Sequence, residues 1–137
     1  MPASSSAPLL ALVVDDSRDC AESLALLLRF WGQEAVVAYD GPAALEAARA
    51  GRPDVVLLDI AMPGMDGCQL ARHLRQMAGM EEALLVAVTG HGSEADVRRC
   101  QEAGIDCHFT KPVDPEELKQ VLVRAERLGR EHRQLAC

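Results

Sequence analysis

The stretch VVLLD at Val55–Asp59 decides the interpretation of this chain, because four apolar residues are followed directly by a carboxylate. A short apolar run of this kind is typical of a buried strand. A second apolar run, Leu9–Val14, ends on the acidic pair Asp15 and Asp16. Ligands of open α/β sheets bind beyond the carboxyl ends of the strands. The sequence therefore predicts that both acidic sites lie where a ligand would bind.

Strand-like and helix-like segments alternate along the whole chain. The predicted strands are Leu9–Val14, Ala35–Ala38, Asp54–Leu58, Leu84–Val88 and Ile105–Thr110. The predicted helices are Ser17–Trp31, Pro42–Ala50, Cys68–Met77, a helix from its cap Ser93 to Ala103, and a last helix that starts at Asp114-Pro115 and keeps an apolar stripe to Leu128. Five such β-α units predict a parallel sheet with helices on both faces.

Side chains suited to chemistry follow several of the predicted strands and so gather on one edge of the sheet: Asp15, Asp16, Asp59, Thr89 and Lys111. They come from the first, third, fourth and fifth strands. They can meet only if the first and third strands are central neighbours. This condition favours an α/β fold of the flavodoxin-like (βα)5 class with the strand order 2-1-3-4-5.

Composition limits the possible functions. The chain has 137 residues, enough for one domain with a core, and its residues are 49% hydrophobic but only 3% aromatic, which predicts an aliphatic core. The net charge of −7 argues against nucleic-acid binding by this domain itself. No apolar run reaches membrane-spanning length, so we expect a soluble protein. We expect residues 1–8 to be a disordered lead-in, residues 9–128 the domain, and residues 129–137 a tail or an extension of the last helix.

Cysteines occur at positions 20, 68, 100, 107 and 137, an odd number without a C-x-x-C pair or zinc-like spacing. They predict neither a disulfide framework nor a zinc site. Because the sequence shows no signal peptide, we expect reduced, mostly buried thiols and a cytoplasmic location.

The acidic side chains predict a metal site. Carboxylates supply the hard oxygen ligands that suit Mg²⁺, and Asp16 and Asp59 are the best candidates, with Asp15 bound directly or through water. Crowded carboxylates repel one another without a cation, so the cluster implies one. If Asp59 carried a phosphoryl group, Mg²⁺ and Lys111 would neutralise its oxygens and the Thr89 hydroxyl would donate to another.

Each of these residues alone has a plainer explanation, such as a helix cap for Asp15 or Asp16 and a turn for Lys111-Pro112. In order and together, they resemble the receiver domain of two-component response regulators, the relatives of the chemotaxis protein CheY. The resemblance runs from about Leu9 to Leu128 and rests on the Asp15-Asp16 pair, VVLLDIAMPGMDG around Asp59, VAVTG around Thr89 and FTKPVD around Lys111. The separations of 30 residues from Asp59 to Thr89 and 22 from Thr89 to Lys111 are also similar to those of the family.

The resemblance implies a phosphoacceptor. Asp59 would take a phosphoryl group from a phosphohistidine on a sensor histidine kinase or a histidine phosphotransfer domain. Asp16, Asp59 and the backbone carbonyl of Ala61 would bind Mg²⁺, with help from Asp15. Lys111 would contact the phosphoryl group, with a cis peptide bond before Pro112.

The resemblance also implies a switch. Thr89 would move toward the phosphate and shift the surface formed by the fourth helix, the fifth strand and the fifth helix, a surface through which the domain could also form a homodimer. Physically this is a population shift, biased by contacts that the phosphate makes in one state only. The domain would be a signalling module rather than an enzyme, promoting only its own phosphotransfer and dephosphorylation.

This chain departs from the family pattern at His108. The family usually has Tyr or Phe three residues before the lysine, and imidazole is smaller, polar and titratable near neutral pH. His108 therefore either replaces the ring, leaves the switch to Thr89 and its loop, or is an ordinary half-exposed strand residue. Ala61 and His91 are implied to flank the path of a hydrolytic water. Ala61 cannot orient water and His91 either orients or blocks it, so we expect a slow to moderate loss of phosphate.

Arginines recur every three residues in the tail, at positions 124, 127, 130 and 133. They are either a basic stripe for a partner or, as we favour, a solvated helix end balanced by Glu126 and Glu131. Beyond Leu128 the sequence leaves no room for an output domain. We therefore expect either a regulator that acts alone on an output protein or a receiver cut from a longer protein such as a hybrid kinase.

The same residues bear on three other possible functions. A haloacid-dehalogenase-like phosphatase needs a second acid two residues after its nucleophile, where this chain has Ala61. A nucleotide-binding Rossmann domain needs G-x-G-x-x-G after the first strand, where this chain has Asp15-Asp16-Ser17-Arg18. A phosphate-independent, receiver-like interaction module remains the alternative, although such proteins typically lack one of the acids or the lysine.

Overall fold

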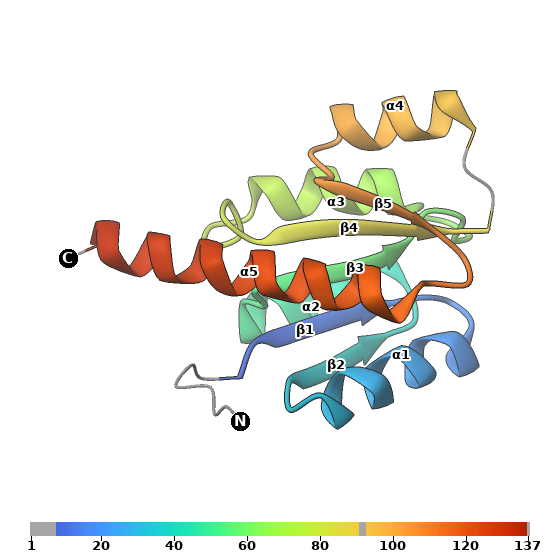
Figure 1. Ribbon diagram of the computed structural model, residues 1–137. Coiled ribbons are helices and arrows are strands. Elements are labelled where there is room, and N and C mark those ends of the chain that lie inside the picture. Colours follow the sequence, from blue (N-terminus) through green and yellow to red (C-terminus); the bar gives the residue numbers. More distant parts are fainter. Residues whose placement is uncertain (1–7, 91–92, 137) are drawn as a thin grey trace.

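The computed structural model describes residues 8–90 and 93–136, with side chains described as far as Leu128. In this part of the chain, parallel strands form one sheet in the order β2-β1-β3-β4-β5 (Figure 1). The strands are β1 (Leu10–Val14), β2 (Glu34–Ala38), β3 (Val55–Asp59), β4 (Leu84–Thr89) and β5 (Cys107–Thr110). The helices are α1 (Arg18–Phe30), α2 (Gly41–Gly51), α3 (Gly67–Gln76), α4 (Glu94–Glu102) and α5 (Pro115–Ala136). The predicted fold class and strand order are confirmed.

The sheet is a layer between two groups of helices (Figure 1). On one face, α2, α3 and α4 pack against side chains such as Leu12, Val56 and Leu85. On the other face, α1 and α5 pack against the alternate side chains, such as Val13 and Leu57. Strands covered on both sides read as continuous apolar runs, which is why β1, β3 and β4 were visible in the sequence. The core is almost entirely aliphatic.

Polar caps fix where the helices start, and they therefore fix the lengths of the loops at the site. The caps are Ser17 for α1, Asp40 for α2, Asp66 for α3 and Ser93 for α4. Asp66 forms a capping box, because its carboxylate accepts from the Gln69 N–H and the Gln69 side chain accepts from the Asp66 N–H. Each cap satisfies a backbone donor that the first turn of a helix leaves unpaired.

The structure corrects the predicted elements mainly at their ends. The fifth strand begins at Cys107 rather than Ile105. Just before it, the Asp106 N–H donates to the Leu85 carbonyl at 2.8 Å, but the Leu85 N–H donates to the Asp106 side-chain Oδ2 at 2.9 Å. Asp54 lies before β3 rather than in it, and its Oδ2 accepts from the Leu10 N–H at 2.9 Å. The last helix extends well beyond Leu128 to Ala136. Among the described residues, every helix is too short or too polar to cross a membrane.

Gly67 brings the start of α3 against the end of β3. A Cβ at this position would lie 2.6 Å from the Asp59 carbonyl oxygen and 2.8 Å from the Ile60 Cα. These are backbone atoms, which cannot swing aside as the end of a long side chain can. A residue without a Cβ is therefore required here, and it sets the course of the segment that carries Asp59.

We predict that Gly67→Ala lowers the free energy of unfolding by about 1–3 kcal/mol, the range found for overpacked interiors. Gly90→Ala is the matched control, because a Cβ there would meet nothing within 4 Å. Urea unfolding followed by circular dichroism measures both variants. Equal stability of the two would show that the approach of α3 to β3 tolerates a Cβ.

Candidate functional site

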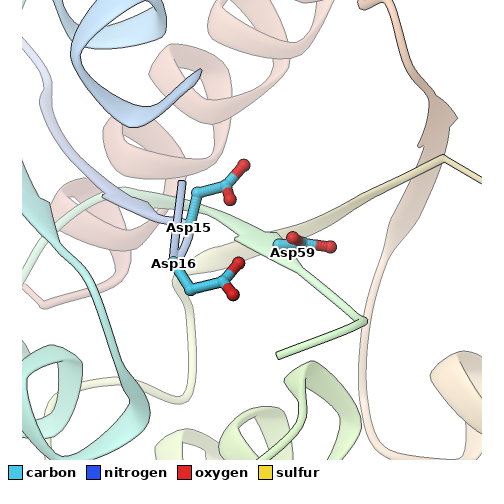
Figure 2. A group of neighbouring side chains, drawn as sticks. All are labelled: Asp15, Asp16 and Asp59. Carbon is cyan, nitrogen blue, oxygen red and sulfur yellow. The ribbon is translucent and has the colours of Figure 1, made fainter. Parts of the chain in front are cut away.

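Three carboxylates gather at the carboxyl ends of two neighbouring strands (Figure 2). Asp15 and Asp16 follow β1, and Asp59 is the last residue of β3. One oxygen of each carboxylate lies within 4.8 Å of one from each of the others. Asp15 and Asp59 are buried, whereas Asp16 is exposed. The cluster, called the acidic pocket below, thus has two buried acids and one exposed acid.

Lys111 provides the positive charge that compensates the buried acids. Its Nζ donates to Asp15 Oδ2 at 2.9 Å and lies 3.6 Å from Asp59 Oδ2. The side chain comes from the loop between β5 and α5, where the Lys111–Pro112 peptide bond is cis. The Lys111 N–H donates to the Thr89 carbonyl at 2.7 Å, which fixes the start of this loop against the end of β4.

Backbone donors orient both buried carboxylates. The Ser17 N–H donates to Asp15 Oδ1 at 2.9 Å, and the Ala61 N–H donates to Asp59 Oδ1 at 3.0 Å. Each carboxylate therefore has one oxygen held by the chain and the other turned toward Lys111. Ser17, not Asp15 or Asp16, caps α1, so the plainer explanation of these acids as helix caps is wrong. The sequence did not predict that the Ser17 N–H holds the Asp15 carboxylate. The position of Ser17 directly after the acidic pair could have indicated it.

The charges of the pocket shift the ionisation of its groups. Burial raises the pKa of Asp59, and the nearby charge of Asp15 acts in the same direction, against the lowering effects of the Ala61 N–H and the Lys111 ammonium. Burial disfavours the charged ammonium, but its hydrogen bond to Asp15 and the charge of Asp59 outweigh this and raise the pKa of Lys111. The single positive charge of Lys111 thus does not balance the negative charge of the carboxylates.

The donor set fits a hard divalent cation. Its members are carboxylate oxygens, which such cations prefer, and they lie close enough to share one ion. The same pocket offers an ammonium that could neutralise an added anion. A cation held beside a carboxylate and an ammonium is the arrangement that phosphoryl transfer requires, because that reaction depends on positioning and charge neutralisation.

The other predicted residues are divided between this pocket and its surroundings. Thr89 is buried at the end of β4, beside the Lys111 loop, and Ala61 is exposed just after Asp59. His108 is half-buried on β5 and lines a small cavity beside α4 with Val97 and Gln101. Its Nε2 is buried and, within the described structure, without a hydrogen-bond partner. His91 lies outside the described residues.

Residues 11–123 match the model of a known family, the response regulator receiver domain. The chain belongs to the response regulator receiver family. It is 43% identical over 107 residues to the DNA-binding response regulator MtrA of Mycobacterium tuberculosis, and the alignment covers 78% of this chain and 46% of MtrA. The chain thus matches about half the length of that relative.

Solved structures agree with this assignment. The chemotaxis protein CheY4 of Vibrio cholerae superposes with a TM-score of 0.82 at 28% identity, over 87% of this chain and 99% of CheY4. The receiver domain of a signal transduction histidine kinase from Syntrophus aciditrophicus superposes with a TM-score of 0.78 at 29% identity, over 87% of this chain and 90% of that domain. The expected family is confirmed: this is a receiver domain of two-component signalling, and the role of its family is to accept a phosphoryl group.

We predict that Asp59→Asn raises the free energy of unfolding by roughly 1 kcal/mol in metal-free buffer near neutral pH. The change removes a desolvated negative charge and keeps the Oδ1 acceptor for the Ala61 N–H. Asp16→Asn, which removes the same charge from an exposed position, should have a smaller effect. Urea unfolding with EDTA present measures both, and a larger effect at Asp16 would contradict the assigned desolvation.

Proposed function

We propose that Asp59 is the residue of this receiver domain that accepts the phosphoryl group. The observation that carries the proposal is a buried carboxylate held by the Ala61 N–H at 3.0 Å, with the Lys111 ammonium 3.6 Å away. The donor would be a phosphohistidine on a sensor histidine kinase or a histidine phosphotransfer domain. An Asp59 carboxylate oxygen attacks the phosphorus atom, an O–P bond forms, the N–P bond breaks, and the imidazole takes up a proton.

Mg²⁺ is the proposed cofactor. Asp15, Asp16, Asp59 and the backbone carbonyl of Ala61 would hold it, and the clustered carboxylate oxygens of the three aspartates support this choice. When bound, Mg²⁺ supplies positive charge to the phosphoryl oxygens. Lys111 would supply a second positive charge, since its Nζ lies 2.9 Å from Asp15 Oδ2 and 3.6 Å from Asp59 Oδ2. Backbone N–H groups already orient one oxygen of each of these two carboxylates.

The phosphorylated state is proposed to act through Thr89 and the surface of α4, β5 and α5. Thr89 lies at the end of β4, next to the loop that carries Lys111. A phosphoryl group that draws Thr89 and Lys111 toward it would favour one of two arrangements of this surface. The same surface is the candidate interface for a homodimer.

The domain is a signalling module, and we propose that its only chemistry is its own phosphorylation and dephosphorylation. Ala61 and His91 would set the lifetime of the aspartyl phosphate. Ala61 has no polar group to hold a hydrolytic water beside Asp59, so hydrolysis is expected to be slow to moderate.

The partners follow from the family role. We propose a histidine kinase or phosphotransfer domain as donor, in the cytoplasm, and either an output protein or a covalently linked kinase module as the receiver of the signal. MtrA is a DNA-binding regulator and the Syntrophus aciditrophicus domain comes from a kinase, so both contexts occur among relatives. The net charge of −7 supports a domain that binds no nucleic acid by itself.

The deciding experiment is the intact mass of the protein after incubation with acetyl phosphate and Mg²⁺. We expect the wild type to gain one phosphoryl group and Asp59→Asn to gain none. The same spectra, taken after acetyl phosphate is removed, give the lifetime, and complete loss within seconds would contradict slow hydrolysis. If the wild type gains nothing while Mg²⁺ binds, the phosphate-independent interaction module becomes the better function.

A second prediction concerns His108, whose buried Nε2 has no partner among the described residues. We propose that His108 takes the place of the aromatic ring in the switch. His108→Ala should then reduce, several-fold, the phosphorylation-dependent change in hydrogen exchange across α4. Cys107→Ala is the control, because its side chain packs on the opposite face of the sheet, with α1 and α5. An unchanged response in His108→Ala would leave His108 as an ordinary strand residue.

A further inference from the structure

Two buried cysteines meet between α3 and α4. Cys68 is the second residue of α3 and Cys100 lies near the end of α4, and their sulfur atoms are 3.5 Å apart. Their exposed fractions are 2% and 1%. The sulfurs are thus in contact, although the two residues are 32 positions apart in the sequence.

The contact matters because α4 is held by few side chains. Cys100 is the buried residue of α4, whereas α3 buries five of its residues. An ion pair also joins the cap of α3 to α4, with Arg99 Nη2 3.0 Å from Asp66 Oδ2. Both side chains of that pair are partly exposed, so it contributes little to stability. A covalent bond at Cys100 would therefore strongly restrict the movement of α4. The same bond on a better-packed helix would have a smaller effect.

We propose that Cys68 and Cys100 are a reversible modification site, in which a peroxide oxidises the two thiols to a disulfide that fixes α4 to α3. In the first step one sulfur attacks a peroxide oxygen, the O–O bond breaks, a sulfenic acid forms and one water leaves. In the second step the other sulfur attacks the sulfenic sulfur, the S–S bond forms, the S–O bond breaks and a second water leaves. Overall two thiols lose two electrons and two protons, and hydrogen peroxide is reduced to two waters.

The closed structure makes this oxidation slow, which suits a response to sustained oxidant. Burial, followed by the hydrogen bond with Cys68, raises the pKa of Cys100 to about 12, so the thiol stays protonated near neutral pH. Protonated thiols are poor nucleophiles. Peroxide must also reach sulfurs that are almost fully buried. Oxidation therefore depends on transient movement of α4 away from α3, and the sulfurs must then approach from 3.5 Å to the bonded distance of about 2.05 Å.

The consequence for signalling rests on the proposed function. A disulfide would hold α4 in its present position, so phosphorylation of Asp59 could no longer shift that helix. Neither cysteine takes part in the hydrogen bonds and ion pairs that join Asp15, Asp59 and Lys111. Oxidised protein should therefore still be phosphorylated, while the phosphorylation-dependent change in hydrogen exchange across α4 is lost and returns after reduction with dithiothreitol.

The test uses the full chain with Cys20→Ser, Cys107→Ser and Cys137→Ser, which removes the other thiols. After exposure to hydrogen peroxide, peptide mass spectrometry should find Cys68 joined to Cys100 within one chain, and the unfolding midpoint should rise by several degrees until dithiothreitol is added. Adding Cys68→Ala should abolish both results. Absence of the joined peptide at all peroxide concentrations that leave the protein folded would overturn the proposal.

The gating step has its own test. Arg99→Ala removes the ion pair to Asp66 and should speed disulfide formation about two- to fivefold, the size expected from an exposed ion pair. Arg98→Ala, an exposed neighbour on the same helix, should leave the rate unchanged. Equal rates in both variants would refute gating by α4. Disulfide formation, its rate and the unfolding midpoint are measured without phosphorylation. A failure of this proposal is therefore distinguishable from a failure of Asp59 to accept a phosphoryl group.

Discussion

Buried negative charge at the carboxyl ends of β1 and β3 is the constraint on which the rest of the structure depends. Asp15 and Asp59 are almost fully desolvated, and a buried carboxylate is costly unless it is paired and hydrogen-bonded. The pairing comes from Lys111, which is 96 positions from Asp15 in the sequence. The loop between β5 and α5 must therefore reach across β4 to the centre of the sheet. The strand order 2-1-3-4-5 is the one that lets these distant groups meet.

The two halves of the molecule differ in how firmly they are held. The central strands β1, β3 and β4 are buried along nearly their whole length, and the helices beside them pack through several aliphatic side chains each. This part keeps the carboxylates in fixed positions. Across the sheet, β5 is only half-buried and α4 contributes a single buried side chain, Cys100. α4 and β5 are therefore the elements whose displacement would cost the least packing energy when the charge of the pocket changes.

The sequence predicted the centre of the fold better than its edges, for physical reasons. β1, β3 and β4 are covered on both faces, so they appear as continuous apolar runs, and the acids that follow them fix the strand order. β5 lies at an edge, and its start at Cys107 depends on a hydrogen bond from the Leu85 N–H to Asp106 that no local pattern reveals. Arg75 was equally hidden: it donates to the carbonyls of Met80, Glu81, Ala83 and Gly104 and to the Asp106 carboxylate. The contact of Cys68 with Cys100 likewise exists only once α3 and α4 are packed.

The short connection between β4 and α4 explains why the firm and the loosely held halves can be coupled. β4 ends at Thr89, whose carbonyl accepts from the Lys111 N–H, and α4 begins at Glu94, five residues later. In the proposed function, a phosphoryl group on Asp59 would act on Lys111 and Thr89 together, because the Lys111 N–H donates to the Thr89 carbonyl. The proposed effect would then reach α4 through the residues between Thr89 and Glu94. There the helix is held by Cys100, the half-buried Val97 and the partly exposed Asp66–Arg99 pair. Coupling of this kind needs a two-state element at the far end rather than a long chain of contacts, and α4 has the weak anchorage that such an element requires.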